Sequence, residues 1–240
     1  MKRDYENEIR INIGENGELK HDKYLDHCLP FAFGVCNEEH NLRCKGCLKF
    51  YNFFEKIVPL LPENELENIE NHRQKLYYYL AHQTRKVYLN TQLRSSLLEL
   101  DENGAVIIVD YKMRILPKTA QETKTEFYGK RGWTLHSVLM YTKPDNQENY
   151  NITAYDHWSD DTKQDAWFTA SSLNAVFETM STRPKWVTII SDNGPHYHNS
   201  EMMVVLSYWK DWYDITIRKW IFLEPGEAKT TIDSHHAQVN

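Results

Sequence analysis

The sequence is poor in the residues and segments that mark several specialised classes of protein. Glycine and proline account for only 9 and 8 of the 240 residues, which excludes collagen-like and low-complexity chains. The longest unbroken apolar run, residues 105–109, is far shorter than the ~20 residues of a membrane-spanning helix. Residues 1–6 are mostly charged and contain no apolar core of a secretory signal. We therefore expect a protein that is not secreted, does not enter membranes and works in the nucleus or elsewhere inside the cell.

Positive charge is also in short supply. The 28 lysines and arginines are outnumbered by 34 aspartates and glutamates, which gives a net charge of −6. This balance argues against a protein dedicated to nucleic-acid binding, because such proteins neutralise phosphates. Residues 112–131 depart from the average, with six basic and two acidic side chains. This strip predicts either a local surface that attracts nucleic acid or an ordinary solvated face.

Cysteine is absent from most of the chain, and its four copies, at positions 28, 36, 44 and 47, lie close together. In a chain without a secretory signal, such clustering favours metal over disulfides. We predict that residues 21–55 form a small module, preceded by a polar tail at 1–20. One structural Zn²⁺ is expected there. The predicted ligands are Cys36, His40, Cys44 and Cys47, with Cys28 and His27 as alternatives.

The remaining sequence predicts an α/β domain preceded by a long helix. Apolar residues recur at three- and four-residue steps over 60–100, which predicts a connecting helix that ends before the turn at 101–104. The β-branched run at 105–110 and residues 186–192 are typical of strands buried on both faces. Further strands are predicted at 133–141, 151–158 and 215–223, and helices at 165–180, 201–212 and from 230. This order predicts a five-stranded sheet with helices on its faces, over residues 105–240.

Acidic residues follow three of the predicted strands. Asp110 and Asp192 end the two buried strands, and the fifth strand is followed by Glu227 and Asp233. Ligands bind at the carboxyl ends of strands in open α/β sheets. Three carboxylates at one place repel each other unless a divalent cation lies between them. The pattern therefore predicts a site for Mg²⁺ or Mn²⁺, although each acid alone also fits a turn, a solvated loop or a helix cap.

Three segments carry a resemblance to a known family: AVIIVDYKMRILP at 105–117, TIISDNGPHYHNSE at 188–201 and EPGEAKTTIDSHHAQ at 224–238. Together they resemble the ribonuclease-H-like (DDE/DDD) core of transposases and integrases. They are most similar to transposon-derived proteins of mobile elements in which a Cys/His cluster and a long helix precede this core. The resemblance implies a ribonuclease-H-like mixed sheet and metal-dependent cleavage and transfer of DNA strands. It also implies DNA as the partner, and it is compatible with a homo-oligomer.

The identity of the third acid and the activity of this chain stay open at this point. We favour Asp233, because the first turn of a helix would fix it, whereas Glu227 lies in a Pro-Gly loop but matches an integrase-like spacing. Only seven residues follow Asp233, so the core is expected to be incomplete at its C-terminus and the helix to depend on Ile232, His236 and Val239. We therefore expect this chain to bind DNA weakly and to cleave it very slowly or not at all. The alternative function is a non-catalytic module that binds DNA or protein and retains the fold.

Overall fold

The computed structural model describes residues 9, 12–14, 18–40, 42–116, 121, 123–129, 132–144, 149–224 and 231–238. The chain forms two compact units, Met1–Ser95 and Ser96–Asn240. The predicted Cys/His module and most of the predicted connecting helix therefore fall within one unit. Glu227 and Val239 lie outside the described residues.

The first unit is helical. It contains η1 (Leu25–His27), α2 (Leu29–Ala32), α3 (Lys45–Ile57), η2 (Val58–Leu60), η3 (Glu63–Glu65) and most of α4 (Leu66–Leu98). The sequence from residue 63 to 98 has no glycine or proline, which allows α4 to run without a break. Arg85 Nη1 donates a hydrogen bond to the carbonyl of Ala32 at 3.1 Å and so ties α4 to the end of α2.

The second unit is an α/β unit built on one five-stranded mixed sheet. Its strands are β1 (Gly104–Ile115), β2 (Trp133–Thr142), β3 (Asn151–Ser159), β4 (Trp186–Asp192) and β5 (Thr216–Leu223). The order across the sheet is β3-β2-β1-β4-β5. β2 is antiparallel to β1 and β3, whereas β1, β4 and β5 are parallel. The predicted α/β class and the five predicted strands are confirmed.

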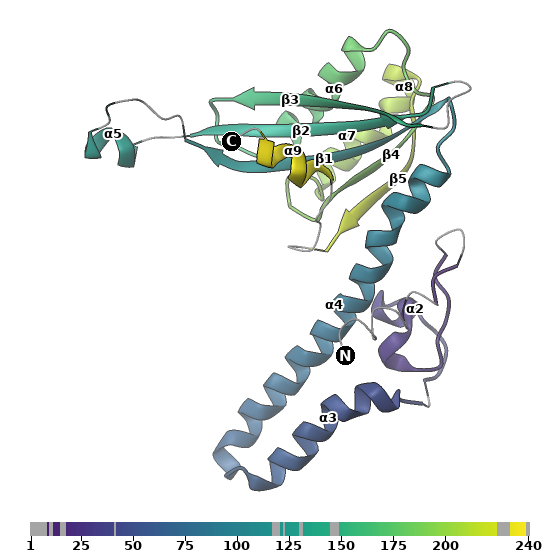
Figure 1. The fold of residues 1–240 in the computed structure, drawn as a ribbon, viewed down its shortest axis with the longest axis vertical. Helices are drawn as coiled ribbons and strands as arrows, with labels where there is room; N and C mark the ends of the chain where they lie inside the picture. The colour runs from purple at the N-terminus through teal and green to yellow at the C-terminus, as the bar shows by residue number, and fades with distance from the viewer. Residues whose placement is uncertain are drawn as a thin grey trace. The chain divides into compact units, whose positions relative to one another are not determined.

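Helices lie on both faces of this sheet (Figure 1). They are α6 (Ala166–Thr179), α7 (Ser200–Ser207), α8 (Trp209–Tyr213) and α9 (Thr231–Gln238), whereas α5 (Lys124–Gly129) lies beyond the ends of β1 and β2 (Figure 1). The main core lies between one face and α6, α7 and α8, where Val109, Leu173 and Met202 are fully covered. α9 packs against β1 on the opposite face (Figure 1). The predicted helix over 201–212 is in fact two helices, because the chain turns at Tyr208 and so buries Trp209.

β1 and β4 are buried on both faces, as the unbroken apolar runs predict. Ile107 and Ile189 contribute to the core beneath α6, α7 and α8. Ile108 and Ile190 point to the other face and are each only 1% exposed. Gly104 begins β1 against Trp186, where a Cβ atom would lie 2.1 Å from the indole ring. The two central strands are therefore fixed in register by packing from both sides.

Candidate functional site

Asp110 and Asp192 lie side by side on the parallel strands β1 and β4. Asp192 ends β4 as predicted, whereas β1 continues beyond Asp110 to Ile115. β1 and β4 are parallel, with Ile108 opposite Ile190. Two residues further along each strand, Asp110 and Asp192 occupy the same level and the same face, because side chains alternate along a strand. This is the face against which α9 packs. The structure therefore brings the first two predicted acids together.

Asp233, the preferred third acid, joins them from the first turn of α9. Burial raises the pKa of Asp110, and the charges of Asp192 and Asp233 raise it further, to about 7 from an ordinary 3.8. Like charges near one another repel, and a divalent cation bound between them would relieve this repulsion. An all-oxygen donor set of this kind fits Mg²⁺ or Mn²⁺. Glu227, the alternative third acid, lies outside the described residues.

A histidine flanks each of the two strand acids. His236 Nδ1 lies 3.6 Å from Asp110 Oδ2, and His196 Nε2 lies 3.5 Å from Asp192 Oδ1. Burial raises the pKa of Asp192, but the His196 ring and the Gly194 N–H outweigh burial and leave it below its ordinary value. Burial lowers the pKa of His236, and the charge of Lys112 lowers it further. At neutral pH the site therefore combines an ionised Asp192 with an uncharged His236.

The loop after β4 holds Asp192 and His196 in place. Gly194 N donates a hydrogen bond to Asp192 Oδ1 at 2.9 Å. Tyr197 is fully buried, and its hydroxyl lies 3.0 Å from His136 Nε2 in the core. His198 lies 2.7 Å, through Nδ1, from Asn193 Oδ1 and stacks on Phe222. These contacts fix the segment 192–198 and hold His196 beside Asp192.

α9 is attached to the sheet by polar contacts at both of its histidines. His235 Nε2 lies 2.9 Å from Asp156 Oδ2 on β3. Lys112 Nζ donates a hydrogen bond to the carbonyl of His236 at 2.5 Å. Ile232 is 2% exposed, and His236 is buried as well. Ile232 and His236, two of the three predicted packing residues, thus hold Asp233 over the sheet.

Asp156 is a fourth acid of this face that the sequence did not identify. Asp110 pairs with Ser137 on β2, and Ser137 pairs with Asp156 on β3, so the three side chains form one row across the sheet. Ser137 Oγ donates a hydrogen bond of 2.5 Å to Asp156 Oδ1. β3 is an edge strand whose backbone is exposed, but the Asp156 side chain itself is only 25% exposed. Asp156 could not be identified from the sequence, because only the pairing of β1, β2 and β3 places it in the same row as Asp110.

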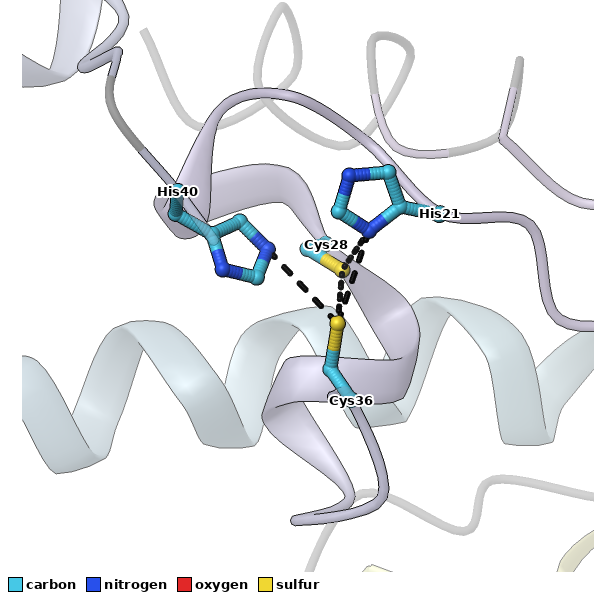
Figure 2. A group of neighbouring side chains, drawn as sticks. All are labelled: His21, Cys28, Cys36 and His40. Carbon is cyan, nitrogen blue, oxygen red and sulfur yellow. Dashed lines mark hydrogen bonds between the residues drawn. The ribbon is translucent and has the colours of Figure 1, made fainter. Parts of the chain in front are cut away.

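The Cys/His segment of the first unit forms two groups. His21, Cys28, Cys36 and His40 converge in the first group, which Figure 2 shows. The second group contains His27, Cys44 and Cys47. In each group the potential ligand atoms all lie within 4.8 Å of one another, and all four cysteines are free thiols.

The predicted single set of four ligands is therefore divided. Cys36 and His40 belong to one group, whereas Cys44 and Cys47 belong to the other, with His27. Cys28, one of the predicted alternatives, joins Cys36 and His40. The turn after α2, where Gly34 has a φ of 73°, returns the chain toward Cys28 and separates Cys36 from the start of α3. His21 was not among the predicted ligands, although it precedes Cys28 by only 7 residues, a separation that could have placed it in the cluster.

Comparison with known protein families gives one match. Residues 90–240 match the model of a family described as a domain of unknown function, DUF8701. The chain belongs to the DUF8701 family. The matched DUF8701 segment contains Asp110, Asp156, Asp192 and Asp233, whereas the Cys/His groups precede it.

No curated protein matches the sequence. Among the described residues, no helix is both long and apolar enough to cross a membrane.

Proposed function

We propose that the second unit is a ribonuclease-H-like core of the transposase and integrase type, which cleaves and transfers DNA strands with the help of Mg²⁺ or Mn²⁺. The observation that carries the proposal is the convergence of Asp110, Asp192 and Asp233 on one face. The sheet order β3-β2-β1-β4-β5, with only β2 antiparallel, supports it, because ribonuclease-H-like sheets are arranged in this way. The preceding Cys/His groups and helix α4 fit an origin from a mobile element.

In this proposal the three acids hold the cations, and other residues hold the acids. Two divalent ions about 4 Å apart would stabilise the attacking and leaving oxygens of a phosphoryl transfer. Asp110 and Asp192 are fixed by strands that are buried on both faces, and Asp233 is fixed by the contacts of α9. Neutral His236, whose Nδ1 lies 3.6 Å from Asp110 Oδ2, would orient the Asp110 carboxylate toward the cations.

The face of the sheet that carries Asp110 and Asp192 also carries exposed aromatic side chains. Trp158 follows Asp156 by two residues on β3, so its side chain lies on the acid face. The Trp158 and Trp133 rings meet edge to face, with centroids 6.2 Å apart, and are 44% and 47% exposed. Exposed aromatic rings stack on unpaired bases of any sequence. This supports DNA with a locally unpaired strand as the substrate.

A strand-cleavage assay with a labelled DNA duplex and a single strand tests the proposal. In Mg²⁺ or Mn²⁺ we expect cleavage that Asp110→Asn and Asp192→Asn each reduce at least a hundredfold. Asp211→Asn is the matched control, because Asp211 is an exposed acid on α8, which packs on the opposite face. Cleavage that survives Asp192→Asn would contradict the proposal.

The net charge of −6 favours a second function, a non-catalytic binding module that retains the fold. Here Mn²⁺ would raise the melting temperature and Asp110→Asn would abolish the shift, but no DNA would be cut. If Mn²⁺ neither raised the melting temperature nor supported cleavage, both the catalytic and the non-catalytic form of the metal-site proposal would be wrong.

A further inference from the structure

The first Cys/His group has the dimensions of a tetrahedral zinc site. Zn–S bonds of about 2.3 Å and Zn–N bonds of 2.0–2.1 Å place tetrahedral ligands about 3.4–3.8 Å apart. The Cys28 and Cys36 sulfurs are 3.9 Å apart. His21 Nδ1 lies 3.6 Å from Cys28 Sγ and 3.4 Å from Cys36 Sγ, and His40 Nε2 lies 3.9 Å from Cys36 Sγ (Figure 2). These separations match the edges of one coordination tetrahedron with two sulfur and two nitrogen ligands.

The second group has the same chemistry with three described ligands. His27 Nε2 lies 3.4 Å from Cys47 Sγ, again the length of a tetrahedral edge. Cys44 precedes α3 and Cys47 lies in its first turn, so the Cys-x₂-Cys pair is held on one short piece of backbone. Both His27 and Cys47 are buried. Thiolate and imidazole ligands select Zn²⁺ over Mg²⁺ or Ca²⁺.

We propose that the first unit binds two zinc ions, one at His21, Cys28, Cys36 and His40 and the other at His27, Cys44 and Cys47. This inference does not depend on the proposed nuclease function. The two sites are interleaved along the chain, because the neighbouring residues His27 and Cys28 belong to different sites. Each ion therefore fixes one side of the turn that links η1 to α2.

The scarcity of apolar core in this unit explains why metal would be needed. Among the described residues, the buried apolar side chains of the first unit are Ile9, Cys28, Leu29, Cys47, Phe54 and Val87. Two of these six are themselves cysteines of the two groups. Small modules without a sufficient core are commonly held together by metal or disulfides. A disulfide does not fit the Cys28–Cys36 pair, because its sulfurs are 3.9 Å apart rather than about 2.05 Å.

Measurements on the unmodified full-length chain test the proposal without any variant. Native mass spectrometry should show two zinc ions per chain. X-ray absorption at the zinc edge should give an average of two sulfur ligands per zinc, since both sites contain two cysteines. One zinc with three sulfur ligands would overturn the proposal in favour of a single Cys36, His40, Cys44 and Cys47 site. A metal-free folded chain, or a mass two hydrogens lower from a disulfide, would also overturn it.

Variants then assign each ion to its ligands. His21→Ala and Cys28→Ser should each reduce the zinc content from two to one, and so should Cys47→Ser. His72→Ala is the matched control, because His72 is an exposed histidine of the same unit on α4 and should leave both ions in place. Retention of both ions by His21→Ala and by Cys28→Ser would contradict the first site. Retention by Cys47→Ser would contradict the second.

Discussion

At the scale of single residues, Asp110 shows how burial and neighbouring charges act on the site that it forms with Asp192 and Asp233. It lies on β1, a strand that is buried on both faces, and the charges of two other carboxylates act on it. A folded protein without metal must therefore either keep a proton on this group or tolerate the repulsion. Asp110 could be identified from the sequence because it ends an apolar run. Its raised pKa could not, because it depends first on the burial of Asp110 in the fold and then on Asp192 and Asp233 approaching from distant parts of the chain.

Asp110→Asn should stabilise the metal-free protein at pH 8 and not at pH 4. The folded-state pKa of about 7 lies above the ordinary 3.8, so in the wild type stability is lost as the pH rises from about 4 to about 7. At 1.36 kcal/mol per pKa unit, the gain for the variant at pH 8 is at most about 4 kcal/mol. Urea unfolding in the presence of a chelator measures this difference. Added Mn²⁺ should reverse the order by stabilising only the wild type, and a variant that is less stable at pH 8 without metal would contradict this account.

Gly194→Ala should disturb the site through a single methyl group. A Cβ atom at position 194 would lie 2.4 Å from His196 Cε1 and 2.9 Å from Asp192 Oδ1. His196 cannot easily move away, because its ring already contacts Tyr111 and Tyr197. We expect a loss of about 1–2 kcal/mol of stability and weaker Mn²⁺ binding by calorimetry.

Gly129→Ala serves as the control for this change, since nothing lies within 4 Å of a Cβ atom at position 129. Equal effects of the two substitutions would show that the crowding at Gly194 has no consequence for the site.

At the scale of elements, α9 differs most from the expectation for an isolated segment. A helix of eight residues is marginal in water on its own. The sequence predicted that Ile232 and His236 would hold it, and both are buried. It did not predict the contact between His235 and Asp156, because Asp156 lies 79 residues earlier in the chain. The local pattern thus predicted the helix and its apolar contact, whereas its polar attachment depends on strand pairing.

Asp156→Ala should weaken metal binding without removing one of the three proposed ligands. The substitution removes the partner of His235 and so loosens the helix that carries Asp233. Loss of a group that orients a ligand typically costs 10–100-fold in metal affinity, and we expect about tenfold for Mn²⁺. His235→Ala should have the same effect, and the double variant should add little, because both substitutions break one contact.

Asp160→Ala, at an exposed acid just beyond β3, is the control and should bind Mn²⁺ normally. Additive losses in the double variant would show that Asp156 acts independently of α9, for example by binding the metal itself.

At the scale of the whole molecule, the two units differ in how much apolar core they bury and in how much of their structure could be predicted from the sequence. In the second unit, the sequence predicted all five strands, and the two that are buried on both faces, β1 and β4, could be read directly from their β-branched runs. In the first unit, the sequence revealed the Cys/His cluster but not its division into two groups. Ligand grouping depends on how the chain turns at η1 and at Gly34, and neither turn leaves a periodic pattern.

Removal of zinc should therefore unfold part of the first unit and leave the second intact. Binding of a structural zinc ion contributes about 10–16 kcal/mol in small zinc modules, more than the few buried side chains of the first unit can replace. The sheet of the second unit has its own core beneath α6, α7 and α8 and contains none of the cysteines. Hydrogen exchange before and after treatment with a zinc chelator should show lost protection at α2 and at the start of α3, with β1 and β4 unchanged.

Adding Zn²⁺ back should restore the protection, whereas adding Mg²⁺ should not. Loss of protection in β1 and β4 together with α2, or no loss anywhere, would show that the first unit does not owe its structure to zinc.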